Sequence, residues 1–75
     1  MRIAIAGGHG RVAMLLHPLL RERGHEVAGL IRDPAQADDL RAAGAEPIAC
    51  DLEARDEIAD CVAGADAVVF AAGAG

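Results

Sequence analysis

A cluster of glycines near the amino terminus combines residue types and spacing that could bind an anion. The apolar residues 3–6 lead into Gly7-Gly8-His9-Gly10, and a helical pattern begins beyond them. Glycines at positions 7 and 10 allow a sharp turn, and without a Cβ they let a phosphate approach the backbone closely. A helix that starts here points its first N–H groups and the positive end of its dipole at the same place. The stretch therefore predicts a phosphate-binding corner, with a tight turn that binds nothing as the alternative.

Two arginines could decide which dinucleotide such a corner prefers. Arg32 follows the second predicted strand. Its spacing from Gly10 is close to that at which a dinucleotide-binding fold places a residue against the adenosine ribose. An acid there bonds the 2′-hydroxyl of NAD, whereas an arginine accommodates the 2′-phosphate of NADP. Arg11 could approach the same phosphate from the other side, so the pair favours NADP, with NAD as the weaker candidate. The alternatives are that both arginines are solvated and that Asp33 bonds the ribose, although its Asp-Pro-x-Gln context favours a helix cap.

Further candidate residues lie where the third and fourth predicted strands end. Asp51 could reach the amino edge of an adenine and Leu52 could pack on its ring, or Asp51 could simply begin a helix. The small residues Ala71, Ala72 and Gly73 would admit a cofactor beside the first strand, or form a glycine turn without a ligand. His9, in the first glycine turn, could donate to a phosphate or be a solvated loop residue.

The composition limits the chemistry of this chain. It contains no Ser, Thr, Lys, Tyr, Asn or Trp, so hydroxyl nucleophiles, a catalytic lysine and a tyrosine acid are excluded. The net charge of −5 argues against a nucleic-acid partner, which would need clustered Lys or Arg. No apolar run approaches the roughly 20 residues of a membrane span, and the start lacks a signal peptide, so we expect a cytoplasmic protein without a membrane partner.

The cysteines and the remaining histidines are expected to have structural or surface roles. Cys50 and Cys61 fit reduced, mostly buried thiols, and no C-x-x-C spacing suggests a metal site. His17 falls in a helical segment, and we expect it on the surface or partly packed. His25 precedes a strand and is expected in an exposed turn.

Apolar periodicity predicts the elements that must position these residues. In the first helix, the i, i+3, i+4, i+7 spacing of Val12, Leu15, Leu16 and Leu19 predicts the buried face, and Pro18 predicts a kink. The predicted strands are 3–6, 26–31, 47–50 and 67–71, and the predicted helices run from the glycine turn to Gly24, from Asp33 to about Ala43, and over 55–63.

The order βαβαβαβ with short loops predicts a doubly wound parallel sheet. Alternating strands and helices imply right-handed crossovers and the strand order 3-2-1-4, which is the first half of a Rossmann-like α/β fold. Residues 1–75 would make one NAD(P)-binding half-domain that stops after the fourth strand. Its ligand should lie beyond the carboxyl ends of strands 1 and 4, where the strand order reverses.

The chain resembles the N-terminal cofactor-binding part of atypical, NmrA-like short-chain dehydrogenases/reductases. The motifs that carry the resemblance are Ala6–Ala13, Gly29–Pro34, Cys50–Leu52 and Gly64–Gly73, in that order along all 75 residues. The resemblance implies that the first motif, through Gly7, Gly8, Gly10, Arg11 and Val12, binds the pyrophosphate, and that the basic residue after strand two favours NADP. It also implies that the Asp-Leu pair contacts adenine and that the Ala-Ala-Gly segment lies along the adenosine ribose.

Three departures from the family pattern bear on function. Ala13 replaces a glycine often seen in the first motif, and His9 stands where a small hydroxyl residue is common. The sequence also lacks the downstream part in which family members carry a Ser and a Tyr-x-x-x-Lys. We therefore expect an NADP(H)-binding segment of a reductase-like protein, with no catalytic residue in this chain. The parent would transfer hydride to or from a small carbonyl-type substrate.

Other functions stay open at this point. A non-catalytic NAD(P) sensor of NmrA-like type would use the same motifs, and a non-functional truncated fragment would use none of them. The apolar fourth strand lacks a neighbour on one side in the predicted sheet, and unpaired strand edges invite association between copies. Self-association through this strand is therefore expected.

Overall fold

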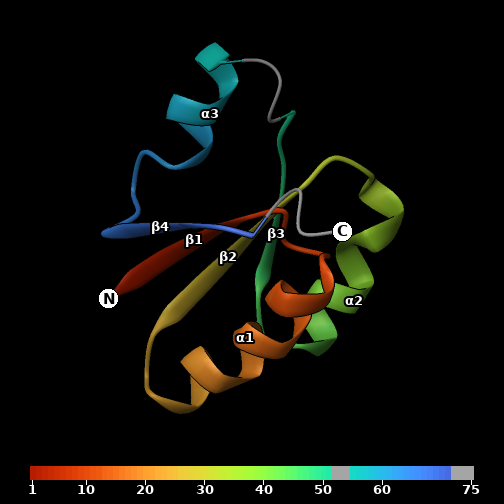
Figure 1. Cartoon of the computed structure of the whole chain (residues 1–75), viewed down its shortest axis with the longest axis vertical. Helices are drawn as coiled ribbons and strands as arrows, with labels where there is room; N and C mark the ends of the chain where they lie inside the picture. Colours follow the sequence, from red (N-terminus) through yellow and green to blue (C-terminus); the bar gives the residue numbers. More distant parts are fainter. Residues whose placement is uncertain (52–54, 72–75) are drawn as a thin grey trace.

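The computed structural model describes residues 1–51 and 55–71, in which strands and helices alternate as expected (Figure 1). The strands and the first and third helices begin and end within about two residues of their predicted bounds, whereas the helix predicted from Asp33 to about Ala43 is divided into a 3₁₀ turn and a shorter α-helix. The elements are β1 (Arg2–Ala6), α1 (Arg11–Glu22), β2 (Glu26–Ile31), the 3₁₀ turn η1 (Pro34–Gln36), α2 (Ala37–Ala42), β3 (Glu46–Ala49), α3 (Arg55–Cys61) and β4 (Ala67–Phe70).

The four strands form one parallel sheet in the order β3-β2-β1-β4. This confirms the predicted doubly wound, Rossmann-like half. β1 pairs with β2 on one side and with β4 on the other, so the strand order reverses at β1. Ala6, the last residue of β1, is in register with Leu30 of β2 and Phe70 of β4. The loops that follow these three strands therefore leave the sheet at the same edge.

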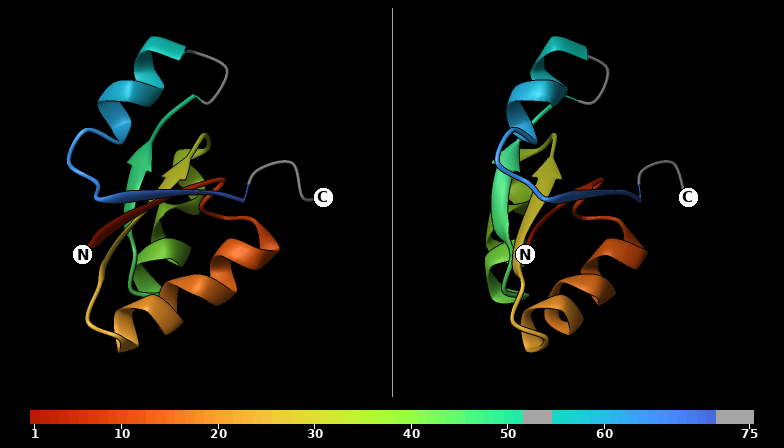
Figure 2. Two further views of the ribbon diagram at one scale, coloured as in Figure 1. Left: turned by 60° about the vertical axis from the view of Figure 1, so that its left-hand side comes forward. Right: turned by 90° about the vertical axis from the view of Figure 1, so that its left-hand side faces the viewer.

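The central strands are apolar on both faces because helices cover both faces. Ile3 and Ile5 of β1 pack with the α1 residue Ala13 and the α2 residue Leu40 in one core cluster. Ala6 and Leu30 belong to a second cluster, against which Ile58, Cys61 and Val62 of the α3 region pack. The chain thus has α1 and α2 on one side of the sheet and α3 on the other, and both views of Figure 2 show α3 set apart from α1 and α2.

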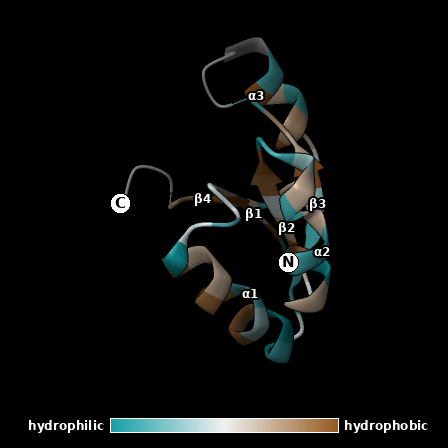
Figure 3. Ribbon diagram, turned by 90° about the vertical axis from the view of Figure 1, so that its right-hand side faces the viewer, coloured by the Kyte–Doolittle hydropathy of each residue, from teal (hydrophilic) through white to brown (hydrophobic). Residues whose placement is uncertain are grey.

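The predicted buried face of α1 is wrong for most of its residues. Val12, Leu15 and Leu19 are 51%, 67% and 55% exposed, and only Leu16 packs partly against the core. Ala13 and His17 are the buried residues of this helix. The small Ala13 side chain lets the helix lie close to the sheet, and this close approach turns the bulkier residues outward. Figure 3 shows hydrophobic stretches, in brown, along both α1 and β4.

Helix α1 continues past Pro18 and ends at the predicted glycine. It is one helix over 12 residues, although Pro18 has no N–H to donate to the Met14 carbonyl. At its end, Gly24 has φ +85°, and its N–H donates to Arg21 O at 3.0 Å. Glycine adopts this left-handed conformation at no steric cost, so it ends the helix as expected.

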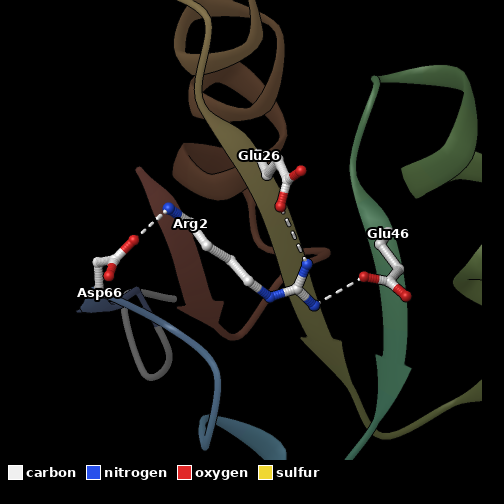
Figure 4. Close-up of polar contacts among 4 residues, drawn as sticks. All are labelled: Arg2, Glu26, Glu46 and Asp66. Atoms are coloured by element: carbon white, nitrogen blue, oxygen red, sulfur yellow. Dashed lines mark hydrogen bonds and ion pairs between the residues drawn. The ribbon is translucent and has the colours of Figure 1, made fainter.

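The start of β1 is tied to its neighbours by Arg2 (Figure 4). Its guanidinium lies 2.8 Å from a Glu46 oxygen on β3 and 3.6 Å from a Glu26 oxygen on β2. Its backbone N–H donates to Asp66 Oδ2, just before β4, at 2.8 Å. The hydrogen bond and charge of Glu46 raise the pKa of Arg2 above its usual value. These contacts lie at the amino-terminal edge of the sheet, opposite the glycine turn.

Candidate functional site

The turn after β1 needs glycine at positions 7 and 10 for different reasons. Gly7 has φ +77°, a conformation that side chains disfavour. Gly10 has an ordinary extended φ of −64°, and its N–H donates to Gly7 O at 2.9 Å, which closes the turn. A Cβ on Gly10 would lie 3.2 Å from Gly7 O and 3.8 Å from Ala71 O. The missing side chain at position 10 thus leaves the backbone accessible where the ends of β1 and β4 meet.

Gly8 anchors this turn on the neighbouring strand. Its N–H donates to Leu30 O of β2 at 2.8 Å. A Cβ on Gly8 would lie only 2.7 Å from Gly29 Cα, a distance that real Cβ atoms do not show. Gly8 therefore serves the close packing of the turn against β2, a role that the sequence pattern did not separate from phosphate binding.

His17 is fully buried, with 0% of its surface exposed, so its predicted surface or partly packed position is wrong. Its Nε2 lies 2.6 Å from the Gly8 carbonyl oxygen and donates to it. Gly29 makes room for this ring, because a Cβ there would lie 3.4 Å from His17 Cε1 and would overlap the side chain of Leu40. The i, i+4 spacing from Ala13, which puts both residues on one helix face, was the signal available in the sequence.

His9 is turned toward the acidic start of α2. Its Nε2 donates to Asp39 Oδ2 at 2.8 Å, and the two side chains are 33% and 64% exposed. The ring is therefore paired within the chain rather than freely solvated. Its contact with a phosphate stays a prediction.

The two arginines proposed to select NADP lie at the same edge of the sheet. Arg11 opens α1 after β1, and Arg32 follows the neighbouring strand β2. Both are exposed, and neither has an ion-pair partner within residues 1–51 and 55–71. The rival Asp33 is occupied as a cap, because its Oδ1 accepts from Ala35 N at 2.9 Å. Val12 lies in the first turn of α1, where helix N–H groups lack intrahelical acceptors.

The end of β4 lies against the glycine turn, as the predicted site requires. Ala71 is half-buried, and its N–H donates to Ala6 O at 2.9 Å. Asp51, after β3, is also half-buried, and its N–H donates to Glu57 Oε2 of α3 at 3.3 Å. The other predicted site residues of these two segments, Leu52, Ala72 and Gly73, lie outside the described residues.

Both cysteines are free thiols, Cys50 after β3 and Cys61 at the end of α3. Cys50 is buried, and Cys61 Sγ lies 3.9 Å from the Ala49 carbonyl oxygen. Burial raises the pKa of Cys50 to about 12, with a contribution from a hydrogen bond to Cys61, so this thiol stays protonated at neutral pH. Within the described part of the chain, no three His, Cys, Asp or Glu side chains are grouped so as to hold a metal ion.

A pocket of about 440 Å³ lies at the opposite, amino-terminal edge of the sheet. Three arginines and two glutamates line it together with small residues, and Glu26 and Glu46 already pair with Arg2. Its charges thus largely compensate one another. None of the helices described here is long and apolar enough to cross a membrane.

Residues 7–75 match a protein-family model described as NAD(P)H-binding. The chain belongs to this NAD(P)H-binding family. The match begins at the first glycine of the turn and includes every residue proposed above for cofactor binding. It confirms a nicotinamide dinucleotide as the ligand class of the family, without separating NADP from NAD.

Similar proteins include the uncharacterized sugar epimerase YhfK of Bacillus subtilis, which is 34% identical over 77 residues. A ketoreductase of Stigmatella aurantiaca that acts on a farnesylated dihydroquinoline oxide, according to its name, is 36% identical over 72 residues. Among solved structures, a Bacillus halodurans protein named as an NAD-dependent epimerase/dehydratase superimposes with a TM-score of 0.90 at 38% identity. It covers 100% of this chain, which confirms the Rossmann-like fold of the NAD(P)H-binding segment.

The chain spans only part of the length of these relatives. It covers 36% of YhfK, 22% of the Stigmatella ketoreductase and 35% of the Bacillus halodurans structure. Each of these proteins is thus considerably longer than the segment that matches this chain. The resemblance to an NmrA-like, NAD(P)-binding Rossmann segment is confirmed.

Proposed function

We propose that residues 1–75 form the NADP(H)-binding N-terminal half-domain of a reductase-like protein. The observation that carries this proposal is the turn over residues 7–10, which is closed by Gly10, anchored on β2 by Gly8 and placed beside Ala71 at the strand-order reversal. Such a turn at the start of a helix directs N–H groups and the positive helix end toward a pyrophosphate. Gly7, Gly8, His9, Gly10, Arg11 and Val12 would hold that group, and Asp51, Leu52, Ala71, Ala72 and Gly73 would line the adenosine side.

The preference for NADP over NAD rests on Arg11 and Arg32. Both side chains are exposed at the carboxyl edge of the adjacent strands β1 and β2, and neither pairs with an acid among the described residues. A guanidinium binds phosphate in a bidentate manner, so two of them near the ribose would favour the extra 2′-phosphate of NADP.

The bound cofactor would supply the hydride, and this chain would supply binding and orientation. The parent protein would transfer hydride to or from a small carbonyl-type substrate, as the ketoreductase among its relatives suggests. The chain has no Ser, Tyr or Lys to act on the substrate. We place the protein in the cytoplasm, because its two cysteines are free thiols.

A second candidate is a non-catalytic dinucleotide sensor, in which cofactor occupancy regulates a partner. Such a sensor would hold the dinucleotide with the same glycine turn and would need no residue that reacts with a substrate. Assays of NADPH oxidation by the parent protein with small carbonyl compounds separate the two candidates, because only a reductase turns over.

Thermal unfolding followed by far-ultraviolet circular dichroism tests the binding proposal. A ligand that binds only the native state stabilises it by about 2.7 kcal/mol at 100 times its dissociation constant. NADPH should therefore raise the midpoint of the 75-residue chain more than NADH does at the same concentration, since the proposal is that NADPH binds more tightly. Arg32→Gln should weaken NADPH binding about 10-fold or more and leave NADH binding unchanged. Arg23→Gln, an exposed arginine at the other end of α1, is the matched control.

Each outcome has a definite meaning for this proposal. Equal shifts with NADPH and NADH, unchanged in Arg32→Gln, would contradict the arginine argument and leave a general dinucleotide site. A chain without a cooperative transition under any condition would support the non-functional fragment that the sequence left open.

A further inference from the structure

The buried ring of His17 has only one protonation form that suits its surroundings. The partner of Nε2 is the Gly8 carbonyl oxygen at 2.6 Å, and a carbonyl can only accept, so Nε2 carries a proton. The other ring nitrogen, Nδ1, is buried and has no hydrogen-bond partner among the described residues. A proton on Nδ1 would therefore be a buried donor without an acceptor, which is costly. His17 is thus a neutral imidazole that donates through Nε2.

This hydrogen bond fixes the orientation of the peptide unit between Gly8 and His9. All described peptide bonds are trans, so the Gly8 carbonyl and the His9 N–H belong to one plane and point in opposite directions. Because His17 holds the carbonyl toward the interior, the His9 N–H is directed outward. The same logic holds one residue earlier, where the Gly8 N–H points to Leu30 O and the Gly7 carbonyl points the other way, to Gly10 N.

The outward N–H of His9 lies next to the first turn of α1. No acceptor for it is found among the described residues. The N–H groups of Arg11 and Val12 start the helix two and three residues later and also lack intrahelical acceptors. Three backbone donors are thereby grouped around the glycine turn, and one of them is oriented by a side chain from the middle of α1.

We propose that His17 is a positioning residue for the cofactor, because its hydrogen bond to the Gly8 carbonyl directs the His9 N–H at the pyrophosphate. This inference rests on the proposed dinucleotide site and assigns a specific donor in it. His17 does not touch the ligand. It acts through the peptide plane of the turn, and the missing side chains of Gly8 and Gly29 give its ring the space to reach that plane.

Substitution of His17 separates this role from simple core packing. His17→Leu fills the space of the ring with an apolar side chain that favours helices, but it removes the donor. His17→Gln retains an N–H group that can reach a carbonyl. We expect the dissociation constant for NADPH to rise about tenfold in His17→Leu, as for one lost hydrogen bond, and to be partly restored in His17→Gln. Val27→Ala, a core substitution at the other end of β2, controls for lower stability.

Nuclear magnetic resonance of the unaltered chain supplies a second measurement that does not depend on variants folding. Ring ¹⁵N shifts should identify His17 as the neutral Nε2–H form, and titration with NADPH should shift the His9 amide together with those of Arg11 and Val12. An Nδ1–H form, or a His9 amide that does not respond while the other two do, would overturn the inference.

The results distinguish this inference from the proposed function. If the unaltered chain binds neither NADPH nor NADH, both are overturned. If it binds NADPH, and His17→Leu binds as tightly as Val27→Ala, the dinucleotide site stands and the role of His17 is refuted.

Discussion

At the scale of single residues, the glycines near the amino terminus are distinguished by what a Cβ would meet. Gly7 requires a positive φ, Gly10 leaves its backbone open toward Ala71, and Gly8 presses directly on Gly29 of β2. The last contact is between two backbones, which cannot move aside as a flexible side chain can. Gly8 is therefore a packing residue as well as a member of the turn proposed to bind the pyrophosphate.

Substitution of Gly8 should accordingly destabilise the fold itself. In Gly8→Ala the new Cβ would lie 2.7 Å from Gly29 Cα, so the turn must move away from β2, and we expect a loss of about 1–3 kcal/mol in the free energy of unfolding. Urea unfolding followed by circular dichroism measures this loss. Gly64→Ala is the matched control, because a Cβ there meets nothing closer than Arg2 Nε at 3.9 Å. Equal stabilities of the two variants would refute the packing role.

At the scale of elements, α1 connects the glycine turn over residues 7–10 to the core. Its buried line of Ala13 and His17 faces the sheet, while Val12, Leu15 and Leu19 face outward. The helix keeps this arrangement although Pro18 removes one hydrogen-bond donor from its interior. The turn is therefore held by a helix whose stability Pro18 lowers.

Replacement of the proline should stabilise α1. Pro18 is exposed, so Pro18→Ala restores an N–H for the Met14 carbonyl without disturbing the core, and we expect the free energy of unfolding to rise by about 1–3 kcal/mol. Thermal melts measure the change. Leu19→Ala, a substitution at another exposed position of the same helix that adds no N–H, should not raise the midpoint to the same extent. A lower midpoint in Pro18→Ala would show that the proline fits α1 better than a regular helical residue.

At the scale of the whole molecule, β4 is an edge strand in the described sheet. It pairs only with β1 there, and Val68, Val69 and Phe70 are 38%, 37% and 71% exposed. An uncovered apolar edge presents backbone donors and acceptors to another chain. We propose, as expected from the sequence, that isolated copies of the 75-residue chain associate through this strand.

A charge on β4 should suppress this association. Phe70→Glu places a carboxylate at the most exposed apolar position of the strand, and sedimentation velocity should then show a shift from associated to monomeric chains. Leu15→Glu makes the same change of charge at a residue of α1 that is 67% exposed, and it should leave the association intact. A chain that is already monomeric without substitution, or an equal effect of both variants, would contradict association through β4.

The sequence by itself determined the elements, their order and the place of the glycine turn over residues 7–10. Short apolar runs, glycine stops and the Asp33 cap are local signals, because each depends on neighbours a few residues away. The strand order then followed from the handedness of crossovers, which leaves few arrangements for four parallel strands. The prediction that the turn over residues 7–10 binds phosphate is local in the same way, since it rests on the place of the turn between a strand and a helix.

Only the tertiary structure decided which face of α1 is buried and how the turn is held. Helical periodicity favoured a face of Val12, Leu15, Leu16 and Leu19, but the helix packs on the sheet through Ala13 and His17. The bond from His17 to Gly8 depends on the space left by Gly29, and the pair of His9 and Asp39 joins residues 30 positions apart. These contacts arise from the packing of segments that are distant in sequence, and no local pattern contains that information.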